Sequence, residues 1–194
     1  TVVHALELVP ERLRAGLDLP DEPFGLVTLH RFELLEREQL FRDSLELLAR
    51  STDRFPLVYV DTPSTSAYLA SRGLEGVFHE RFRRLPRQGY FDFISLLKAS
   101  AFLVTDSGGL QQECTYLGHP CCVHRAKTET ALAPNVRLTG FDLGALSTFL
   151  DDPTSVRTAG AALARRPSDV IVHHLEASGY LAPAPAATAS GAAA

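Results

Sequence analysis

The sequence predicts an α/β domain with a Rossmann-like, doubly wound and mainly parallel sheet. Short apolar runs alternate with helical patterns along the chain, an order that favours βα units with helices on both faces of a sheet. Polar and glycine residues collect where these runs end. The length of 194 residues suits one well-cored domain and is too short for two ordinary ones.

The strand predictions rest on short apolar runs that contain β-branched residues and are bounded by proline, glycine or polar turns. In chain order they are residues 24–29, 56–60, 76–78, 102–105, 121–124 and 135–138. The helix predictions rest on apolar residues that recur every three or four positions among charges. They are residues 36–50, 66–72, 92–100, 109–117, 141–150, 155–164 and 168–178. We expect a folded domain over residues 1–181 and a disordered tail, rich in alanine and proline, over residues 182–194.

Composition excludes several classes of function. Lys and Arg number 19 against 23 Asp and Glu, so the basic field that holds a nucleic-acid backbone is missing and nucleic acid is not an expected partner. The longest apolar runs are too short to cross a membrane. The three cysteines include no C-x-x-C pair, which argues against a zinc site and predicts reduced thiols in a cytoplasmic protein. The chain begins at Thr1 and contains no Met, so we expect a piece of a longer polypeptide.

Ligands of a doubly wound sheet bind at the carboxyl ends of the strands, so candidate chemistry is sought at those junctions. The sharpest junction is a strand end that turns through Gly108 and Gly109 into a helix. Two residues without side chains let the backbone approach a ligand and leave the first N–H groups of the helix facing outward, as an anion site requires. Ser107 can donate its hydroxyl, and Glu113 can accept hydrogen bonds from two vicinal hydroxyls such as those of a ribose. The alternative is an ordinary helix N-cap followed by a tight turn.

Asp106 to Gly109 also spell D-S-G-G, the tetrapeptide around the nucleophile of trypsin-like serine proteases. Such proteases consist of two β-barrels. Alternating strands and helices do not fit that architecture, so we do not expect a protease.

His30 and Arg31 follow the first predicted strand and form a second candidate site. Imidazole and guanidinium both donate to phosphate oxygens, the guanidinium with two parallel hydrogen bonds. The alternative is a histidine that only satisfies a strand end. Arg81, Arg83, Arg84 and Arg87 could hold a phosphate, and His173 with His174 could bind a metal, but solvated surface runs explain both groups better.

Several motifs resemble, in the same order, the C-terminal half of UDP-N-acetylglucosamine 2-epimerases. They are Thr1-Val2-Val3, Val27-Thr28-Leu29-His30-Arg31-x-Glu33, Leu85-Pro86, Tyr90-x-Asp92-Phe93, Leu103-Val104-Thr105-Asp106-Ser107-Gly108-Gly109-Leu110-Gln111-x-Glu113, Leu117-Gly118-x-Pro120 and Lys127-Thr128-Glu129. The match covers about residues 1–140 and, more loosely, the helices up to Gly179.

The resemblance implies a GT-B-like protein of two Rossmann-like domains with a UDP-sugar between them, in which this chain is the C-terminal, nucleotide-holding domain. The N-terminal domain of the same polypeptide, absent from this chain, would supply most of the acid and base carboxylates. The reaction implied is epimerisation at C2 of the sugar, by elimination of UDP and re-addition of UDP or of water. No cofactor and no metal are implied, and a homodimer is one assembly that the resemblance allows.

By the same resemblance, His30 lies near the pyrophosphate and stabilises the departing UDP. Ser107, Gly108 and Gly109 bind the phosphates, and Glu113 holds the ribose hydroxyls. Phe93 falls where the family places an aromatic side chain against the uracil. With Arg31, these residues make up the expected UDP site.

The sequence departs from the family pattern at several of these motifs. Leu34 replaces the family's Asn, Gln112 replaces a second acidic residue, and Thr130 and Ala131 replace an Arg and a Pro. Residues 61–64 read Asp-Thr-Pro-Ser where the family has a loop similar to His-Pro-Asn-Pro. These changes leave two hypotheses: the C-terminal part of a UDP-sugar 2-epimerase, or a domain that binds UDP-sugars with altered specificity or without catalysis.

Overall fold

The computed structural model describes residues 5–7, 9, 17–160 and 167–181. Within these residues six strands form one sheet in the order β3-β2-β1-β4-β5-β6, and every pair of neighbours is parallel. The strands are β1 (Gly25–Thr28), β2 (Leu57–Val60), β3 (Phe82–Leu85), β4 (Phe102–Thr105), β5 (Cys121–Val123) and β6 (Val136–Leu138). The predicted fold class is confirmed: this is a Rossmann-like, parallel α/β sheet.

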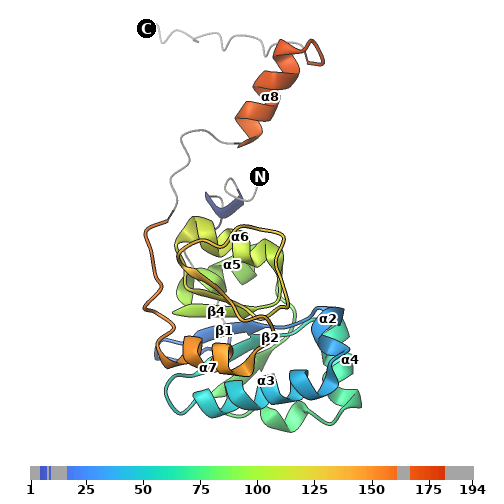
Figure 1. The fold of residues 1–194 in the computed structure, drawn as a ribbon, viewed down its shortest axis with the longest axis vertical. Coiled ribbons are helices and arrows are strands. Elements are labelled where there is room, and N and C mark those ends of the chain that lie inside the picture. The colour runs from blue at the N-terminus through green and yellow to red at the C-terminus, as the bar shows by residue number, and fades with distance from the viewer. Residues whose placement is uncertain (1–4, 8, 10–16, 161–166, 182–194) are drawn as a thin grey trace, which may run out of the picture.

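Helices connect the strands and lie on both faces of the sheet (Figure 1). They are α2 (Phe32–Leu35), α3 (Glu38–Ser51), α4 (Pro63–Ser71), α5 (Tyr90–Ala99), α6 (Gly108–Leu117), α7 (Leu143–Asp151) and α8 (Pro167–Ala177), with a short 3-10 helix, η1, over Glu75–Val77. Figure 1 shows α5 and α6 on one face and α3 and α7 on the other.

The strand order reverses between β1 and β4, which are neighbours in the sheet although helices and two strands separate them in the sequence. Their register pairs Gly25 with Phe102 and Thr28 with Thr105, so both strands end at the same level. Loops that follow two such strands diverge to opposite faces and leave a crevice between them. The loop after β1 and the loop after β4 therefore border the crevice in which folds of this kind bind ligands.

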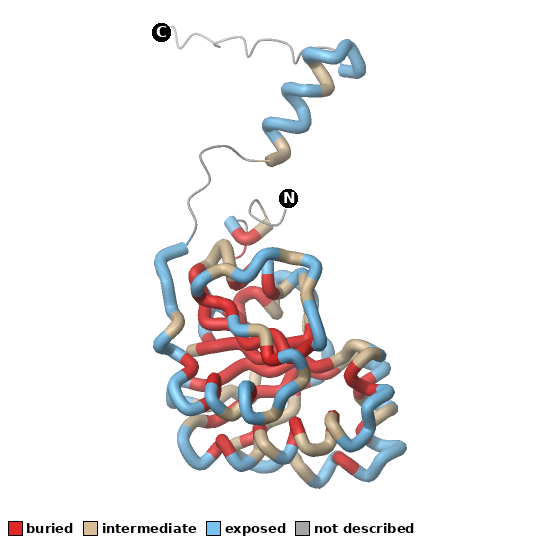
Figure 2. The backbone as a smooth tube through the Cα atoms, in the orientation of Figure 1, coloured by how far each residue is buried: buried red, intermediate tan, exposed pale blue. Residues whose placement is uncertain are grey.

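Two apolar clusters hold the layers together. Buried positions concentrate on the strands in the middle of the domain (Figure 2). One cluster joins the sheet to α3 and α7 through fully buried residues such as Phe41, Leu45 and Leu146, and the other joins it to α5 and α6 through residues such as Ile94 and Cys114. A fully buried side chain of this size contributes about 1.5–3 kcal/mol relative to its exposed state. The rigidity of the sheet under the loops comes from these two clusters.

The third strand lies later in the chain than the sequence predicted. Residues 76–78 fall mostly in η1, whereas the strand is β3, which was missed because Arg83 and Arg84 interrupt its apolar pattern. Both arginines are neutralised by tertiary ion pairs, with Asp18 and Asp61 respectively. An edge strand tolerates such residues because one of its sides has no strand partner.

The helix predicted over residues 155–164 is wrong for its described part, since residues 157–160 have no regular structure. This segment instead packs backbone to backbone against the end of α6, where the Thr158 N–H donates to the Gly118 carbonyl at 3.1 Å. Residues 161–164 and the tail predicted over residues 182–194 lie outside the described part of the chain.

Helix α8 forms close to its predicted bounds, and none of its residues is buried. It lies apart from the sheet in Figure 1. None of the helices in the described ranges is both long and apolar enough to span a membrane.

Candidate functional site at the switch point of the sheet

The loops after β1 and β4 are joined through one carboxylate. Asp106 is fully buried, and its Oδ2 accepts the backbone N–H groups of His30 (2.9 Å) and Arg31 (2.8 Å). The structure thus brings together two junctions that the sequence singled out separately. It also assigns a position to Asp106, which was not among the predicted site residues.

Helix α6 begins at this crevice with the predicted glycine pair. Ser107 is its N-cap, and the Ser107 hydroxyl accepts weakly from the Leu110 N–H at 3.5 Å, so the N-cap interpretation of Ser107 is confirmed. The first N–H groups of a helix have no acceptor within it, and Gly108 and Gly109 occupy these first two positions. The capped start remains suited to an anion, because a cap satisfies only one of these donors.

Arg125 lies against the start of α6, and it was not among the predicted site residues. Its side chain is only 6% exposed, and a Cβ built on Gly108 would lie 3.6 Å from its Nη1. The guanidinium donates to both carboxylate oxygens of Glu129 at 3.1 Å and lies 3.6 Å from Glu33, while Nε has no hydrogen-bond partner. Arg125 comes two residues after the end of β5, and that position at a strand end was the signal that could have found it.

The loop that carries Glu129 is tied to α6 by Gln111, whose side chain is buried. Its Oε1 accepts from the Thr128 hydroxyl at 2.6 Å, and its Nε2 donates to the Ala131 carbonyl at 3.4 Å. Hydrogen bonding to Arg125 lowers the pKa of the Glu129 carboxyl, and the positive charge of Arg31 lowers it further. The Glu129 carboxylate therefore stays charged beside the Arg125 guanidinium.

Glu113 lies one turn inside α6 and is 5% exposed. Burial raises its pKa, a hydrogen bond from Tyr90 lowers it, and its Oε2 has no hydrogen-bond partner. Burial and the Glu113 carboxylate together raise the pKa of Tyr90 to about 12, so the phenol stays a donor at neutral pH. Tyr90 entered the sequence prediction only as part of a motif, and in the structure it lies beside Glu113, which was predicted to bind the ligand.

Phe93 is part of the predicted site but lies deeper than the other aromatic residues of α5. It is half-buried and packs against the apolar cluster under α5, whereas Tyr90 and Phe91 are 44% and 52% exposed. The structure thus places all three on the first turn of α5, at the carboxyl end of β3.

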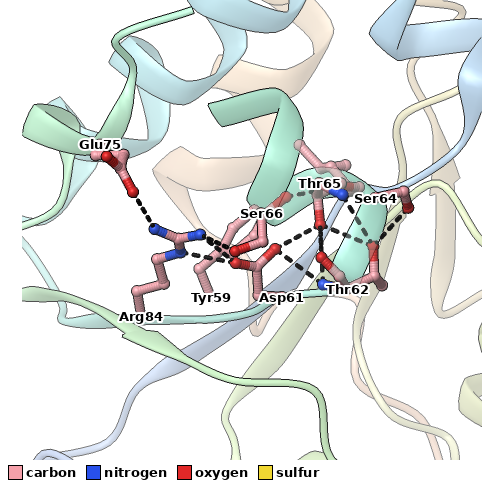
Figure 3. Close-up of polar contacts among 9 residues, drawn as sticks. Tyr59, Asp61, Thr62, Ser64, Thr65, Ser66, Glu75 and Arg84 are labelled. Carbon is pink, nitrogen blue, oxygen red and sulfur yellow. Dashed lines mark hydrogen bonds and ion pairs between the residues drawn. The ribbon is translucent and has the colours of Figure 1, made fainter. Parts of the chain in front are cut away.

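The junction after β2 is closed by its own hydrogen bonds (Figure 3). The Asp61 carboxylate accepts from Arg84 through Oδ2 and from the Thr62 N–H and Thr65 hydroxyl through Oδ1. Arg84 also donates to Ser66 and Glu75. Because these groups already have partners, this junction offers a ligand little beyond the exposed Ser64.

In the structure, three arginines of the basic run form ion pairs, and the two histidines are exposed. Arg81 and Arg83 pair with Glu22 and Asp18, as Arg84 does with Asp61. His173 and His174 lie on the exposed helix α8, and no group of three possible metal ligands occurs among the residues that the structure describes.

A pocket of about 490 Å³ opens on the crevice and is lined by His30, Arg31, Phe32, Glu33 and Ser64. The His30 side chain is 34% exposed there. A second pocket, of about 470 Å³, lies between β6 and α7 and contains none of the predicted site residues. The chemistry of the site therefore favours the first.

The sheet is parallel and Rossmann-like, and arginines and a helix that begins with two glycines lie at its switch point. These features define an α/β protein with a candidate anion-binding site, and they exclude the two-barrel protease. Residues 1–141 match the family model described as UDP-N-acetylglucosamine 2-epimerase, and the chain belongs to this family. The expected family is confirmed.

Curated relatives carry related descriptions. A UDP-N-acetylglucosamine 2-epimerase from Methanococcus maripaludis is 27% identical over 113 residues, 56% of this chain and 31% of the relative. A UDP-2,3-diacetamido-2,3-dideoxy-D-glucuronate 2-epimerase from Pseudomonas aeruginosa is 32% identical over 107 residues, 55% of this chain and 29% of the relative. The matched segment is about a third of the length of either relative.

Solved structures show the same fold. The Methanocaldococcus jannaschii UDP-GlcNAc 2-epimerase in complex with UDP-GlcNAc and UDP superposes with a TM-score of 0.72 at 20% identity, over 91% of this chain and 48% of that one. The Neisseria meningitidis enzyme bound to UDP-GlcNAc gives a TM-score of 0.69 at 22% identity, over 90% and 48%. The chain thus spans about half of each solved chain.

Proposed function

We propose that this chain is the nucleotide-binding half of a UDP-sugar 2-epimerase and that its crevice holds the UDP part of the substrate. The observation that carries the proposal is the start of α6, where Gly108 and Gly109 leave helix N–H groups open beside the buried guanidinium of Arg125. A helix N-terminus and a desolvated cation together favour a ligand with concentrated negative charge. A diphosphate has that charge.

Different residues around the start of α6 contact different parts of the UDP. Gly108, Gly109 and the Ser107 hydroxyl face the phosphates, which Arg31 approaches from the loop after β1. The buried Oε2 of Glu113, which has no hydrogen-bond partner in the chain, accepts from the ribose hydroxyls. Phe93 supplies an aromatic edge for the uracil, with Tyr90 and Phe91 beside it on the same helical turn.

The chemistry proceeds by elimination and re-addition. A base takes the proton from C2, the C1–O bond breaks with its electrons on the leaving UDP, and a C1–C2 double bond forms. UDP or water then adds at C1, and a proton returns to C2. Negative charge grows on the diphosphate as the bond breaks, and donors such as His30 that face that charge lower the barrier. We assign the base to the other half of the protein, so this chain alone binds UDP without turnover.

Exposed apolar side chains support a partner over the crevice. Phe32, Phe91 and Leu132 are 73%, 52% and 51% exposed, and they lie on the segments after β1, β3 and β5 respectively. Large apolar groups gathered on one edge of a sheet mark an interaction surface. We assign this surface to the other half of the two-domain protein.

Titration of the chain with UDP, followed by backbone NMR shifts, tests the binding site. We expect weak, saturable binding that moves the amides of Gly108, Gly109 and His30. A variant with His173→Ala on α8 is the control and keeps the same affinity. Saturation that leaves the glycine loop unmoved would contradict the assignment.

Binding without catalysis is the second candidate, and one observation favours it: the Arg125 guanidinium already holds two carboxylates, Glu129 and Glu33. The two candidates differ in exchange at C2. The two-domain protein, incubated with UDP-N-acetylglucosamine in D₂O, incorporates deuterium at C2 if it is an epimerase. Binding with no exchange identifies the binding module.

A further inference from the structure

Asp106 has a fixed orientation because one of its oxygens already has two donors. Its Oδ2 accepts the N–H groups of His30 and Arg31, residues that lie 76 and 75 positions away in the sequence. The carboxylate cannot rotate without losing both hydrogen bonds. Its other oxygen, Oδ1, therefore has a set position against the His30 ring.

Oδ1 and the His30 Nδ1 face each other at 3.3 Å, which is ion-pair distance, yet the two atoms do not have hydrogen-bond geometry. Both atoms are buried, and neither has another hydrogen-bond partner. Burial raises the pKa of Asp106, while the charge of His30 opposes that shift. A buried polar atom without a partner is costly. A small rotation of the ring that lets Nδ1–H donate to Oδ1 satisfies both atoms at once.

We infer that Asp106 is a positioning residue for His30: it holds the proton on Nδ1 and turns Nε2 toward the crevice. This inference rests on the proposed function for its catalytic meaning, but its geometry does not depend on that function. Since Nδ1 is buried and about a third of the side chain is exposed, the open edge of the ring is the one that carries Nε2. His30 lines the pocket together with Arg31, so we expect this edge to face it.

The pairing determines what the ring does at the leaving diphosphate. With Nδ1–H donated to a carboxylate, the ring can carry a second proton on Nε2, and the carboxylate stabilises the resulting imidazolium. The Nε2–H then donates to the phosphate oxygen on which charge develops. Without the carboxylate the ring keeps its place but loses its preference for that protonation pattern.

Asp106→Asn is a sharp test because an amide has only one acceptor oxygen. The two backbone N–H groups require that oxygen at the Oδ2 position, so the NH₂ group takes the Oδ1 position and faces Nδ1. A donor at that place forces Nδ1 to accept and moves the proton to Nε2. The substitution therefore reverses the tautomer of His30 while it keeps the backbone hydrogen bonds that join the loops.

The measurement is the ¹⁵N shift of both imidazole nitrogens of the free chain at pH 8, where protonated and unprotonated nitrogens are well separated. Signals of His30 are assigned by their loss in His30→Ala. We expect Nδ1–H in the wild type and Nε2–H in Asp106→Asn. Asp142→Asn is the matched control, since Asp142 also accepts a backbone N–H, from Ala145 at 2.7 Å, but caps α7. This control leaves the His30 tautomer unchanged.

In the intact two-domain enzyme, Asp106→Asn is expected to lower kcat by a factor on the order of 10²–10⁴ with a KM change of only a few fold. An Nε2–H tautomer in the wild type, which needs no variant to observe, would overturn the inference. So would a tautomer that is the same in wild type and Asp106→Asn. A reversed tautomer in a chain that does not bind UDP would instead overturn the proposed function and leave the positioning intact.

Discussion

Glu113 is a residue of the proposed site whose surroundings in the folded chain leave a hydrogen-bonding group without a partner. Its carboxylate is buried, its pKa is raised by that burial, and one of its oxygens has no partner. Leaving a buried acceptor unsatisfied costs free energy that a ligand recovers when it supplies donors. Two vicinal hydroxyls are such donors.

Glu113→Gln is therefore expected to weaken UDP binding by about 1.5–3 kcal/mol, the contribution of a hydrogen bond to a charged group. The amide keeps one acceptor but replaces the other by a donor, which opposes a ribose hydroxyl. Calorimetric titration of both proteins measures the difference. Gln112→Ala is the control, because Gln112 is the exposed neighbour of Glu113 on the same helix. Equal affinity of wild type and Glu113→Gln would remove Glu113 from the site.

Local pattern was enough to find the residues that lie directly at strand ends, namely His30 and the glycine pair. A strand followed by glycines and a helix can be located from the sequence alone. Arg125, Asp106 and Tyr90 were not assigned as ligands, because their relevance depends on neighbours that only the folded chain supplies. Asp106 faces a ring 76 positions away. No local spacing encodes that contact.

Among the elements, α6 has a defined beginning and end: it starts at the crevice, with Ser107 as its N-cap, and it ends at Gly118. Gly118 has φ +65°, and a Cβ there would lie 2.2 Å from the Thr158 carbonyl oxygen. The segment after α7 thus passes directly over the last turn of α6. A side chain at this position meets both an unfavourable backbone conformation and a backbone atom that has little freedom to move.

Gly118→Ala is expected to destabilise the domain by about 2–5 kcal/mol, the sum of a left-handed conformation at about 1–2 kcal/mol and a core-type clash at about 1–3 kcal/mol. Gly140→Ala separates the two contributions, since Gly140 has φ +63° but nothing within 4 Å of its Cβ position. Urea unfolding of both variants gives the free energies. Equal losses would mean that the segment over α6 moves aside freely.

The elements that the sequence misplaced are those whose patterns depend on tertiary contacts. Strand β3 carries two arginines, and it forms because Asp18 and Asp61 neutralise them from other segments. The segment after α7 has helical spacing, yet its amide at Thr158 bonds to Gly118 instead of to its own turn. The strands and helices that pack into the two apolar clusters formed close to their predicted bounds. Burial in these clusters stabilises the same apolar periodicity from which the elements were predicted.

For the molecule as a whole, two buried, neutral histidines form hydrogen bonds with residues of other structural elements. His124 lies between the Ser44 hydroxyl (2.9 Å) and the Thr139 hydroxyl (2.7 Å), and His119 lies 3.2 Å from the Ser100 hydroxyl. Burial lowers the pKa of each ring to about 4, helped at His119 by the charge of Arg157. Both rings are uncharged in the folded protein near neutral pH.

The free energy of unfolding is expected to fall as the pH drops from about 6.5 to about 4. In that range the unfolded chain binds a proton at each histidine and the folded chain does not, which costs about 1.4 kcal/mol per pH unit and histidine. Urea unfolding at several pH values measures the slope.

His124→Gln isolates one histidine, because the raised pKa values of Asp106 and Glu113 act with the opposite sign in both proteins and cancel in the difference. We expect a smaller slope in the variant between pH 6.5 and 4. Identical slopes would show that His124 takes up its proton without loss of the fold.

The hydrogen bonds from His30 and Arg31 to Asp106 also link folding to the formation of the proposed site. The crevice comes into existence only when the first and fourth strands lie side by side, after a loop of 75 or more residues has closed. A nascent or partly unfolded chain in which these two strands are not yet paired therefore lacks the crevice. A ligand in this crevice would bind only to a chain whose sheet has formed. Binding would then stabilise the folded chain and protect it from proteolysis.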